Sequence, residues 1–196
     1  CVGAGVIGRT MIMALREVAP SLKQIKLCDL NLEKAQNLAN EFKDEIEVIP
    51  TNSVEEAVTG ADIVATMTTS KKPFVKSDWI KKGSMIIQMS SCEVEGGVVE
   101  KAEKIVVDSW DQMKENDLSI INQMVQQGKI DEADIWSLSD IVCGNKPGRE
   151  NNDEITMFSS RGMGAHDIII GDYLYKEAIK KGLGQKLTLW DEALWV

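Results

Sequence analysis

The stretch that decides the fold is CVGAGVIGRT, residues 1–10, in which Gly3, Gly5 and Gly8 form a G-x-G-x-x-G pattern. In turns of this kind the first glycine allows a tight turn and the second lets the backbone approach a pyrophosphate. The third lets the following helix pack closely on the strand. The pattern therefore predicts a dinucleotide-binding turn between a strand and a helix.

The residues beside the glycines extend this prediction. A helix that starts near Val6 would direct unpaired N–H groups and a positive dipole end toward the phosphates, so Val6 is a candidate binding residue. Only Cys1 and Val2 precede the first glycine. We expect these two residues to be the end of a strand whose earlier part lies outside this chain.

An acidic residue strengthens the dinucleotide prediction. Asp29 ends a predicted strand and follows Gly8 at about the 20-residue spacing typical of the acid that binds ribose. Its carboxylate would bind the ribose hydroxyls and repel a 2′-phosphate, which favours NAD over NADP. The alternative is a purely structural turn, with Asp29 capping a helix that starts near Leu32.

Short apolar runs alternate with helical patterns along the chain, which predicts an α/β fold of the Rossmann type with a doubly wound parallel sheet. Strands are expected at 25–29, 47–49, 62–67, 84–89, 104–107, 155–159 and 185–189. Helices are expected at 31–42, 53–58, 117–127 and 164–181. We expect a dinucleotide-binding domain over 1–150 and a strand–helix segment over 151–196 that completes the site, with the polar loop 144–153 as the linker.

The bulk composition argues against several classes of protein. A formal net charge of −9 and the lack of a basic stripe argue against nucleic-acid and membrane binding. No apolar run approaches the roughly 20 residues needed to span a bilayer. The four cysteines form no C-x-x-C pair and there is 1 histidine, so we expect no metal site, no disulfide framework and a cytoplasmic location.

Three further stretches resemble the ornithine cyclodeaminase/μ-crystallin family. They are the threonine-rich segment 66–70, the segment QMSSC at 88–92 and the segment EITMFSSRGMGAHD at 154–167. The resemblance runs over essentially the whole chain. It implies an NAD(P)-dependent enzyme such as an amino-acid dehydrogenase, a ketimine reductase or a cyclodeaminase.

The resemblance also implies an architecture and partners. Family members often form homodimers, and most of their substrate-binding and dimerisation domain precedes the dinucleotide turn. This chain therefore resembles the cofactor-binding half, with a C-terminal helix that would return to the other domain. The expected ligands are NAD and a small amino-acid or imino-acid substrate.

The resemblance assigns candidate roles to individual residues. Ile7 and Gly8 match the pyrophosphate turn, and Asp29 matches the ribose acid. Further cofactor contacts are expected from Thr68, Met89, Ser90, Ser91 and Ser160. Arg161 matches a neighbouring position that faces the substrate.

The sequence departs from the family at the position of the cyclodeaminase proton-transfer aspartate. That position falls on Cys92, and Glu93 is next to it. Cys92 and Glu93 are therefore the candidate catalytic residues, with an inert buried thiol as the alternative for Cys92. The loss of the aspartate favours simple hydride transfer over cyclisation, and a non-catalytic ligand-binding protein remains the alternative from another class.

Overall fold

The computed structural model describes residues 1–188 and residue 190. The chain divides into two compact units, one over residues 1–161 and the other from residue 162 onward, and each is described by itself. Residues 185–188 form no strand, contrary to the sequence prediction for 185–189, and Leu189 lies outside the described residues.

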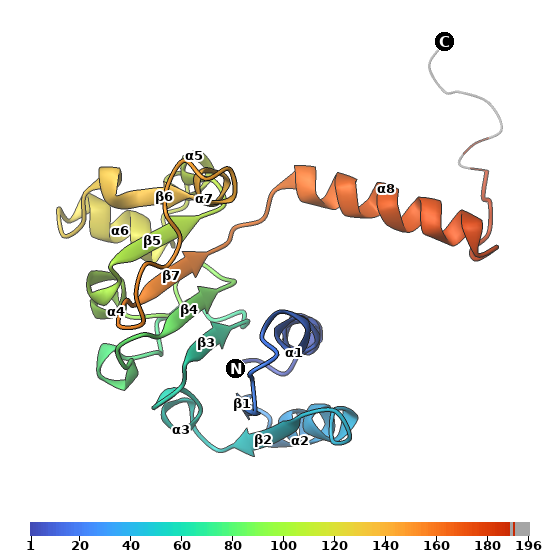
Figure 1. The fold of residues 1–196 in the computed structure, drawn as a ribbon, viewed down its shortest axis with the longest axis horizontal. Coiled ribbons are helices and arrows are strands. Elements are labelled where there is room, and N and C mark those ends of the chain that lie inside the picture. The colour runs from blue at the N-terminus through green and yellow to red at the C-terminus, as the bar shows by residue number, and fades with distance from the viewer. Residues whose placement is uncertain (189, 191–196) are drawn as a thin grey trace, which may run out of the picture. The chain divides into compact units, whose positions relative to one another are not determined.

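The first unit contains a parallel sheet whose strands run in the order β2-β1 and β3-β4-β7-β5-β6 (Figure 1). The strands of the described residues are β1 Gln24–Cys28, β2 Glu47–Thr51, β3 Ile63–Thr66, β4 Met85–Gln88, β5 Lys104–Val107, β6 Ile135–Ser137 and β7 Thr156–Ser159. β6 was not predicted from the sequence, because its apolar run is only two residues long. The other six strands lie where the sequence predicts them, within one or two residues at each end.

Val2 joins the two groups of strands into one sheet. It forms parallel bridges with Cys28 at the end of β1 and with Thr66 at the end of β3. Its N–H donates to the Ala65 carbonyl at 2.8 Å, and its carbonyl accepts from the Met67 N–H at 2.8 Å. Val2 therefore occupies the position between β1 and β3 that is expected for the strand before the glycine turn. In a doubly wound sheet, the point where the strand order reverses is where ligands bind.

Helices cover both faces of this sheet. The helices of the described residues are α1 Val6–Val18, α2 Leu32–Glu41, α3 Val54–Val58, α4 Gly96–Lys101, α5 Trp110–Met113, α6 Ile120–Gln126, α7 Leu138–Val142 and α8 Gly164–Lys180, with the 3₁₀ turns η1 Ser77–Trp79 and η2 Glu132–Asp134. Leu27 of β1 packs with Ile12 of α1 and Leu38 of α2. The next residue, Cys28, joins a second cluster, because successive side chains of a strand point to opposite faces.

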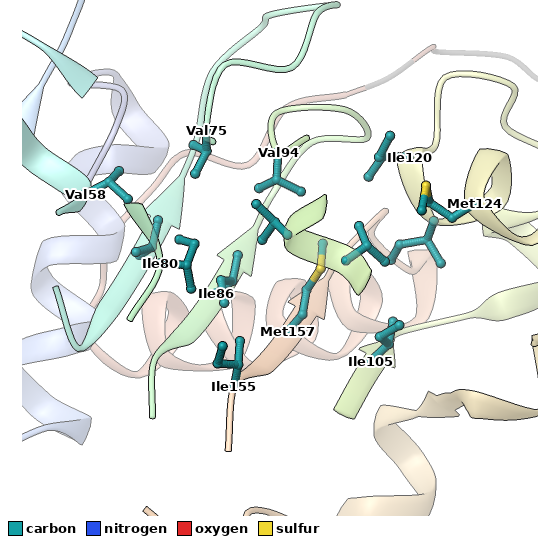
Figure 2. Packing of buried hydrophobic residues seen from close by; sticks show 14 of the residues in the cluster. Val58, Val75, Ile80, Ile86, Val94, Ile105, Ile120, Met124, Ile155 and Met157 are labelled. Carbon is teal, nitrogen blue, oxygen red and sulfur yellow. The ribbon is translucent and has the colours of Figure 1, made fainter. Parts of the chain in front are cut away.

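The second cluster is the larger of the two cores. It packs α3, α4 and α6 against strands β3, β4, β5 and β7 (Figure 2). Ile86, Val94, Ile121 and Met157 are at most 1% exposed in it. Since α1 and α2 cover one face and these helices the other, the doubly wound α/β prediction is confirmed.

Side-chain caps explain where several helices begin. The side chain of Asn31 accepts hydrogen bonds from the N–H groups of Glu33 and Lys34, which starts α2 after the predicted strand. Ser119 caps α6 in the same way, so this helix begins three residues later than the predicted Asp117. Serine and asparagine are among the preferred N-cap residues because their oxygen atoms satisfy first-turn N–H groups.

The loop 144–153 contains no helix or strand, but it is not a free linker. The buried Lys104 at the start of β5 donates from Nζ to the Gly148 carbonyl and, at 2.6 Å, to Glu150. Residues 154–161 continue within the first unit, because β7 lies between β4 and β5. The compact unit thus extends past the expected boundary at residue 150.

The second unit is dominated by α8, which ends before Gly182 in the left-handed region at φ 64°. Its described residues include no buried side chain. The exposed large apolar residues of α8 are Ile168, Ile169, Ile170, Tyr173, Leu174, Tyr175 and Ile179. No helix of the described chain combines the length and apolar character that crossing a membrane requires.

Candidate functional site

The three glycines of the first turn differ in how much space surrounds them. Gly3 has φ 110°, and a Cβ atom there would lie 2.5 Å from the Met67 carbonyl oxygen. A Cβ atom on Gly8 would overlap the Gly3 carbonyl oxygen, whereas one on Gly5 would meet nothing within 4 Å. The fold itself therefore requires glycine at Gly3 and Gly8, while the space beside Gly5 is open to a ligand.

The N-terminus of α1 leaves donors available. Gly5 is the N-cap and has no side chain to bind the first-turn N–H groups. The N–H of Arg9 is the one that closes the first helical turn, on the Gly5 carbonyl at 3.0 Å. Val6 is 84% exposed and Ile7 53% exposed. An uncapped and accessible helix N-terminus of this kind binds anions through its N–H groups and dipole.

Asp29 lies directly behind this turn. Its Oδ2 accepts from the Ala4 N–H at 2.8 Å, and its Oδ1 accepts from the Asn31 N–H at 2.9 Å. The carboxylate is half-buried and has about four acceptor sites, so it can also accept from hydroxyl groups of a ligand. The alternative in which Asp29 caps the next helix is wrong, because Asn31 is the N-cap of α2.

Glu93 accepts hydrogen bonds from the last residue of β3 and from the segment that follows it. Its Oε2 accepts from Thr66 Oγ1 at 2.7 Å, and its Oε1 accepts from both the N–H and the Oγ1 of Thr68 at 2.6 Å. Glu93 is 0% exposed. A side chain in this position supports the site from within and does not face its open edge.

Gln88, the last residue of β4, extends this network to β7. Its Oε1 accepts from the N–H groups of Glu93 and Val94, each at 3.1 Å. Its Nε2 donates to Ser159 Oγ, also at 3.1 Å. Buried side chains thus connect the carboxyl ends of β3, β4 and β7. Gln88 was not predicted as a site residue, because its only signal in the sequence is a polar residue at the end of a buried strand.

Cys92 is 7% exposed, and its Sγ donates to the Ser70 carbonyl at 3.5 Å. Burial, and then the neighbouring Glu93 carboxylate, raise the pKa of the Cys92 thiol. The thiolate is therefore disfavoured, which is the opposite of an activated cysteine. This environment matches the inert buried thiol of the sequence analysis better than a catalytic group.

The segment after β4 carries Met89, Ser90 and Ser91, all half-buried. The N–H of Met89 donates to the Thr66 carbonyl at 3.0 Å. Ser91 Oγ accepts from Asn116 Nδ2 at 2.6 Å. These contacts hold the segment in a defined path at the edge of the sheet.

Asp108 organises the segment after β7. Its Oδ2 accepts from Ser160 Oγ and from the Arg161 N–H, each at 2.9 Å, and its Oδ1 accepts from the Ser109 N–H at 2.9 Å. Asp108 is 7% exposed, whereas Arg161 is exposed. Asp108 was not predicted as a site residue, although it directly follows β5 as Asp29 directly follows β1.

The predicted site residues of the first unit share one edge of the sheet. Because all the strands are parallel, the residues that follow β1, β3, β4, β5 and β7 lie at their carboxyl ends. Asp29, Thr68, Ser90 and Ser160 come from four of these ends. The glycine turn adds an open donor group at the switch point. This edge can hold an extended ligand that carries phosphates and hydroxyl groups.

Comparisons with known proteins identify relatives of the chain. The model of the ornithine cyclodeaminase/mu-crystallin family matches residues 1–182. The N-((2S)-2-amino-2-carboxyethyl)-L-glutamate dehydrogenase of Staphylococcus aureus is 31% identical over 193 residues, which are 96% of this chain and 57% of that protein. The alanine dehydrogenase of Archaeoglobus fulgidus is 30% identical over 195 residues, with 96% and 59% covered.

Solved structures have the same fold. The Thermococcus litoralis Delta(1)-pyrroline-2-carboxylate reductase in complex with NADH and L-proline has a TM-score of 0.83 at 34% identity, over 95% of this chain and 59% of that one. An archaeal alanine dehydrogenase dimer with bound NAD has a TM-score of 0.83 at 29% identity, over 96% and 59%. The chain thus spans less than two thirds of the length of these relatives.

Proposed function

The chain belongs to the ornithine cyclodeaminase/mu-crystallin family, and we propose that it binds NAD for hydride transfer to or from an amino acid or its imine. The observation that carries this proposal is the open space beside Gly5, at the uncapped N-terminus of α1. Packing inside the fold does not require glycine there, so a close approach by a ligand is the reason for it. NAD, when bound, supplies the hydride-transfer chemistry at nicotinamide C4.

The donors and acceptors of the site fit the two halves of a dinucleotide. The N–H groups of the first turn of α1 would bind the pyrophosphate. Asp29, fixed by the Ala4 N–H, would accept from the ribose hydroxyls of the adenosine half. A 2′-phosphate beside this carboxylate would be repelled, which favours NAD over NADP.

The exits of β4 and β7 would bind the nicotinamide half. Ser160 donates its hydroxyl hydrogen to Asp108, so its oxygen would accept from a carboxamide N–H of the cofactor. Met89, Ser90 and Ser91 would line the neighbouring wall. Thr68 uses its hydroxyl hydrogen on Glu93 and accepts from the Ser70 N–H, so its one remaining acceptor site would be available to the cofactor.

An amino-acid or imino-acid substrate is supported by the chemistry of the named relatives. The staphylococcal and archaeal relatives are amino-acid dehydrogenases by name, and the Thermococcus enzyme is a reductase seen with L-proline. The backbone N–H of Arg161 is bound by Asp108, while the residue as a whole is exposed. Its guanidinium would therefore be available to bind a substrate carboxylate. This role for Arg161 is part of the proposal.

Simple hydride transfer is favoured over deaminating cyclisation. Cyclisation needs a proton donor and acceptor at the substrate amine, and the two candidates in this chain are buried. Cys92 has a raised pKa, and the oxygens of Glu93 bind two threonines. A cyclodeaminase regenerates its NAD, so an absence of net NADH change together with ammonia release would favour that alternative.

A homodimer is the proposed assembly of the whole protein. The described part of α8 leaves large apolar side chains such as Ile169 and Leu174 exposed, which a partner surface would cover. The archaeal alanine dehydrogenase relative is a dimer by its description. In family members this helix returns to the substrate-binding and dimerisation domain, and we propose the same here.

Cofactor titration tests the central proposal. We expect NADH to bind the protein with a lower dissociation constant than NADPH, as measured by fluorescence titration with each cofactor. Asp29→Ala should weaken NADH binding about tenfold and narrow the preference over NADPH, because the ribose acceptor is lost. Tighter binding of NADPH by the wild type, or unchanged NADH affinity in Asp29→Ala, would contradict the role of Asp29. If the whole protein binds NAD but exchanges no hydride with any amino acid or with a keto acid plus amine, the non-catalytic alternative is favoured.

A further inference from the structure

We propose that Glu93 is a positioning residue that sets the affinity for NAD without touching it, by holding the segment after β3 against the glycine turn. The proposal rests on the NAD-binding function proposed above. It replaces the catalytic role that the sequence predicts for Glu93 with a supporting one.

The surroundings of Glu93 suit a carboxylate that accepts from polar groups. It is fully buried, and the three donors around it are two threonine hydroxyls and one backbone N–H. A buried carboxylate is costly unless donors surround it. An apolar residue would leave Thr66 Oγ1 and the Thr68 N–H without this acceptor, so the cost serves to fix one short segment of chain.

The fixed segment forms the wall behind the glycine turn. The Met67 carbonyl oxygen lies 2.5 Å from a Cβ atom placed on Gly3, and Thr68 Cγ2 lies 3.5 Å from it. The Met67 N–H donates to the Val2 carbonyl at 2.8 Å. A shift of Thr68 would therefore move the atoms that define the path of the turn at Gly3.

Glu93 itself is held firmly enough to transmit this constraint. Its N–H donates to Gln88 Oε1 at 3.1 Å, and its carbonyl accepts from the N–H groups of Phe74 and Val75 at 2.9 and 3.1 Å. Both its main chain and its side chain are thus engaged. The connection runs from β4 through Glu93 and Thr68 to the turn that would bind the pyrophosphate.

The test uses isosteric substitutions in the full-length protein, with NADH as the probe. Glu93→Gln keeps the shape and removes one acceptor oxygen, while Thr68→Val keeps the methyl and removes the hydroxyl that binds Glu93. We expect each to raise the NADH dissociation constant about tenfold, a fold-change of the size expected for one charge-assisted hydrogen bond. The NADH dissociation constant of the double variant should be at most about twice that of the single variant that binds NADH less tightly. The reason is that both substitutions break the same connection.

Two controls separate positioning from general destabilisation. Thr66→Ser keeps the hydroxyl that binds Glu93, at a buried residue with no assigned cofactor contact, and should bind NADH within about threefold of the wild type. Thr69→Val alters the exposed threonine next to Thr68 and should leave NADH affinity unchanged. Thermal unfolding of each variant shows whether it is folded at the titration temperature.

The outcomes distinguish the two proposals. If the wild type does not bind NADH, the proposed function fails. If the wild type binds and both Glu93→Gln and Thr68→Val bind equally well, the positioning role is overturned while the function stands. Full additivity in the double variant, or a loss of affinity in Thr66→Ser as large as in Glu93→Gln, would also overturn the connection through Glu93.

Discussion

The glycine turn and the segment after β4 lie at the same edge of one sheet, but their hydrogen-bonding groups differ. Those of the turn are left open, and those after β4 are bound inside the protein. At the turn, α1 begins without a side-chain cap, and the space beside Gly5 is open. At the exit of β4, the oxygens of Glu93 are bound by Thr66 and Thr68 inside the protein. On the proposed function, the unused donors of the turn are where the ligand binds, and the satisfied buried groups at the end of β4 hold the binding surface in place.

The largest effect is expected from Gly8→Ala, which tests how tightly the turn itself is packed. The new Cβ atom would overlap the Gly3 carbonyl oxygen, so α1 would have to move away from the turn. We expect a loss of about 1–3 kcal/mol in the free energy of unfolding, as for other overpacked sites. Urea unfolding measures this, and wild-type stability in the variant would show that α1 and the turn are not in close contact.

Gly5→Ser tests whether the open side of the turn serves a ligand. The residue has φ −87° and ψ −166°, which serine adopts readily, and a Cβ atom there meets nothing within 4 Å. Serine would cap α1, so stability should stay the same or rise slightly. NADH affinity should nevertheless fall about tenfold because the side chain occupies the approach path. Unchanged NADH binding would contradict the ligand role of this space.

Asn31→Ala is the counterpart of Gly5→Ser, at a helix whose first N–H groups are already bound by a side chain. The Asn31 side chain accepts from the N–H groups of Glu33 and Lys34, so its removal leaves α2 uncapped. We expect a loss of about 1 kcal/mol in the free energy of unfolding. NADH affinity should not change, since the backbone N–H of Asn31 still binds Asp29. Thermal unfolding and cofactor titration on the same variant check both parts.

The smallest effect is expected at the opposite edge of the sheet, where charges satisfy one another. The backbone N–H of Glu150, and then Lys104, lower the pKa of the Glu154 carboxyl. A lowered pKa means that the unfolded chain binds a proton before the folded chain does as the pH falls. The contribution of Glu154 to stability is therefore present above its unfolded value of 4.5 and is lost as the pH falls below it.

The measurement is the melting temperature between about pH 3 and pH 6, the window in which unperturbed carboxyl groups titrate. Glu154→Gln should melt at a lower temperature than the wild type near pH 6, and the difference should shrink toward pH 3. Asp153→Gln, at the exposed neighbouring residue, serves as the control and should keep the wild-type pH dependence. A constant difference for Glu154→Gln across this range would contradict the assignment.

Local patterns in the sequence predicted most of the fold. The apolar run at 105–107 is continuous because β5, which contains it, is buried on both faces. The glycine spacing and Asp29 identified the turn and its supporting acid. β6 was missed because it is only three residues long, and the expected start of α6 was three residues early because Ser119 forms its cap.

The sequence by itself determined the parallel α/β class, the glycine turn and the acid behind it, because these depend on residues close together in the chain. Only the tertiary structure decided which polar residues face the ligand and which support it. Glu93 contacts Thr66 across 27 positions of sequence, and Ser160 contacts Asp108 across 52. A carboxylate next to a strand end looks the same in a sequence whether it is buried or open. Its role depends on the donors that the fold brings to it.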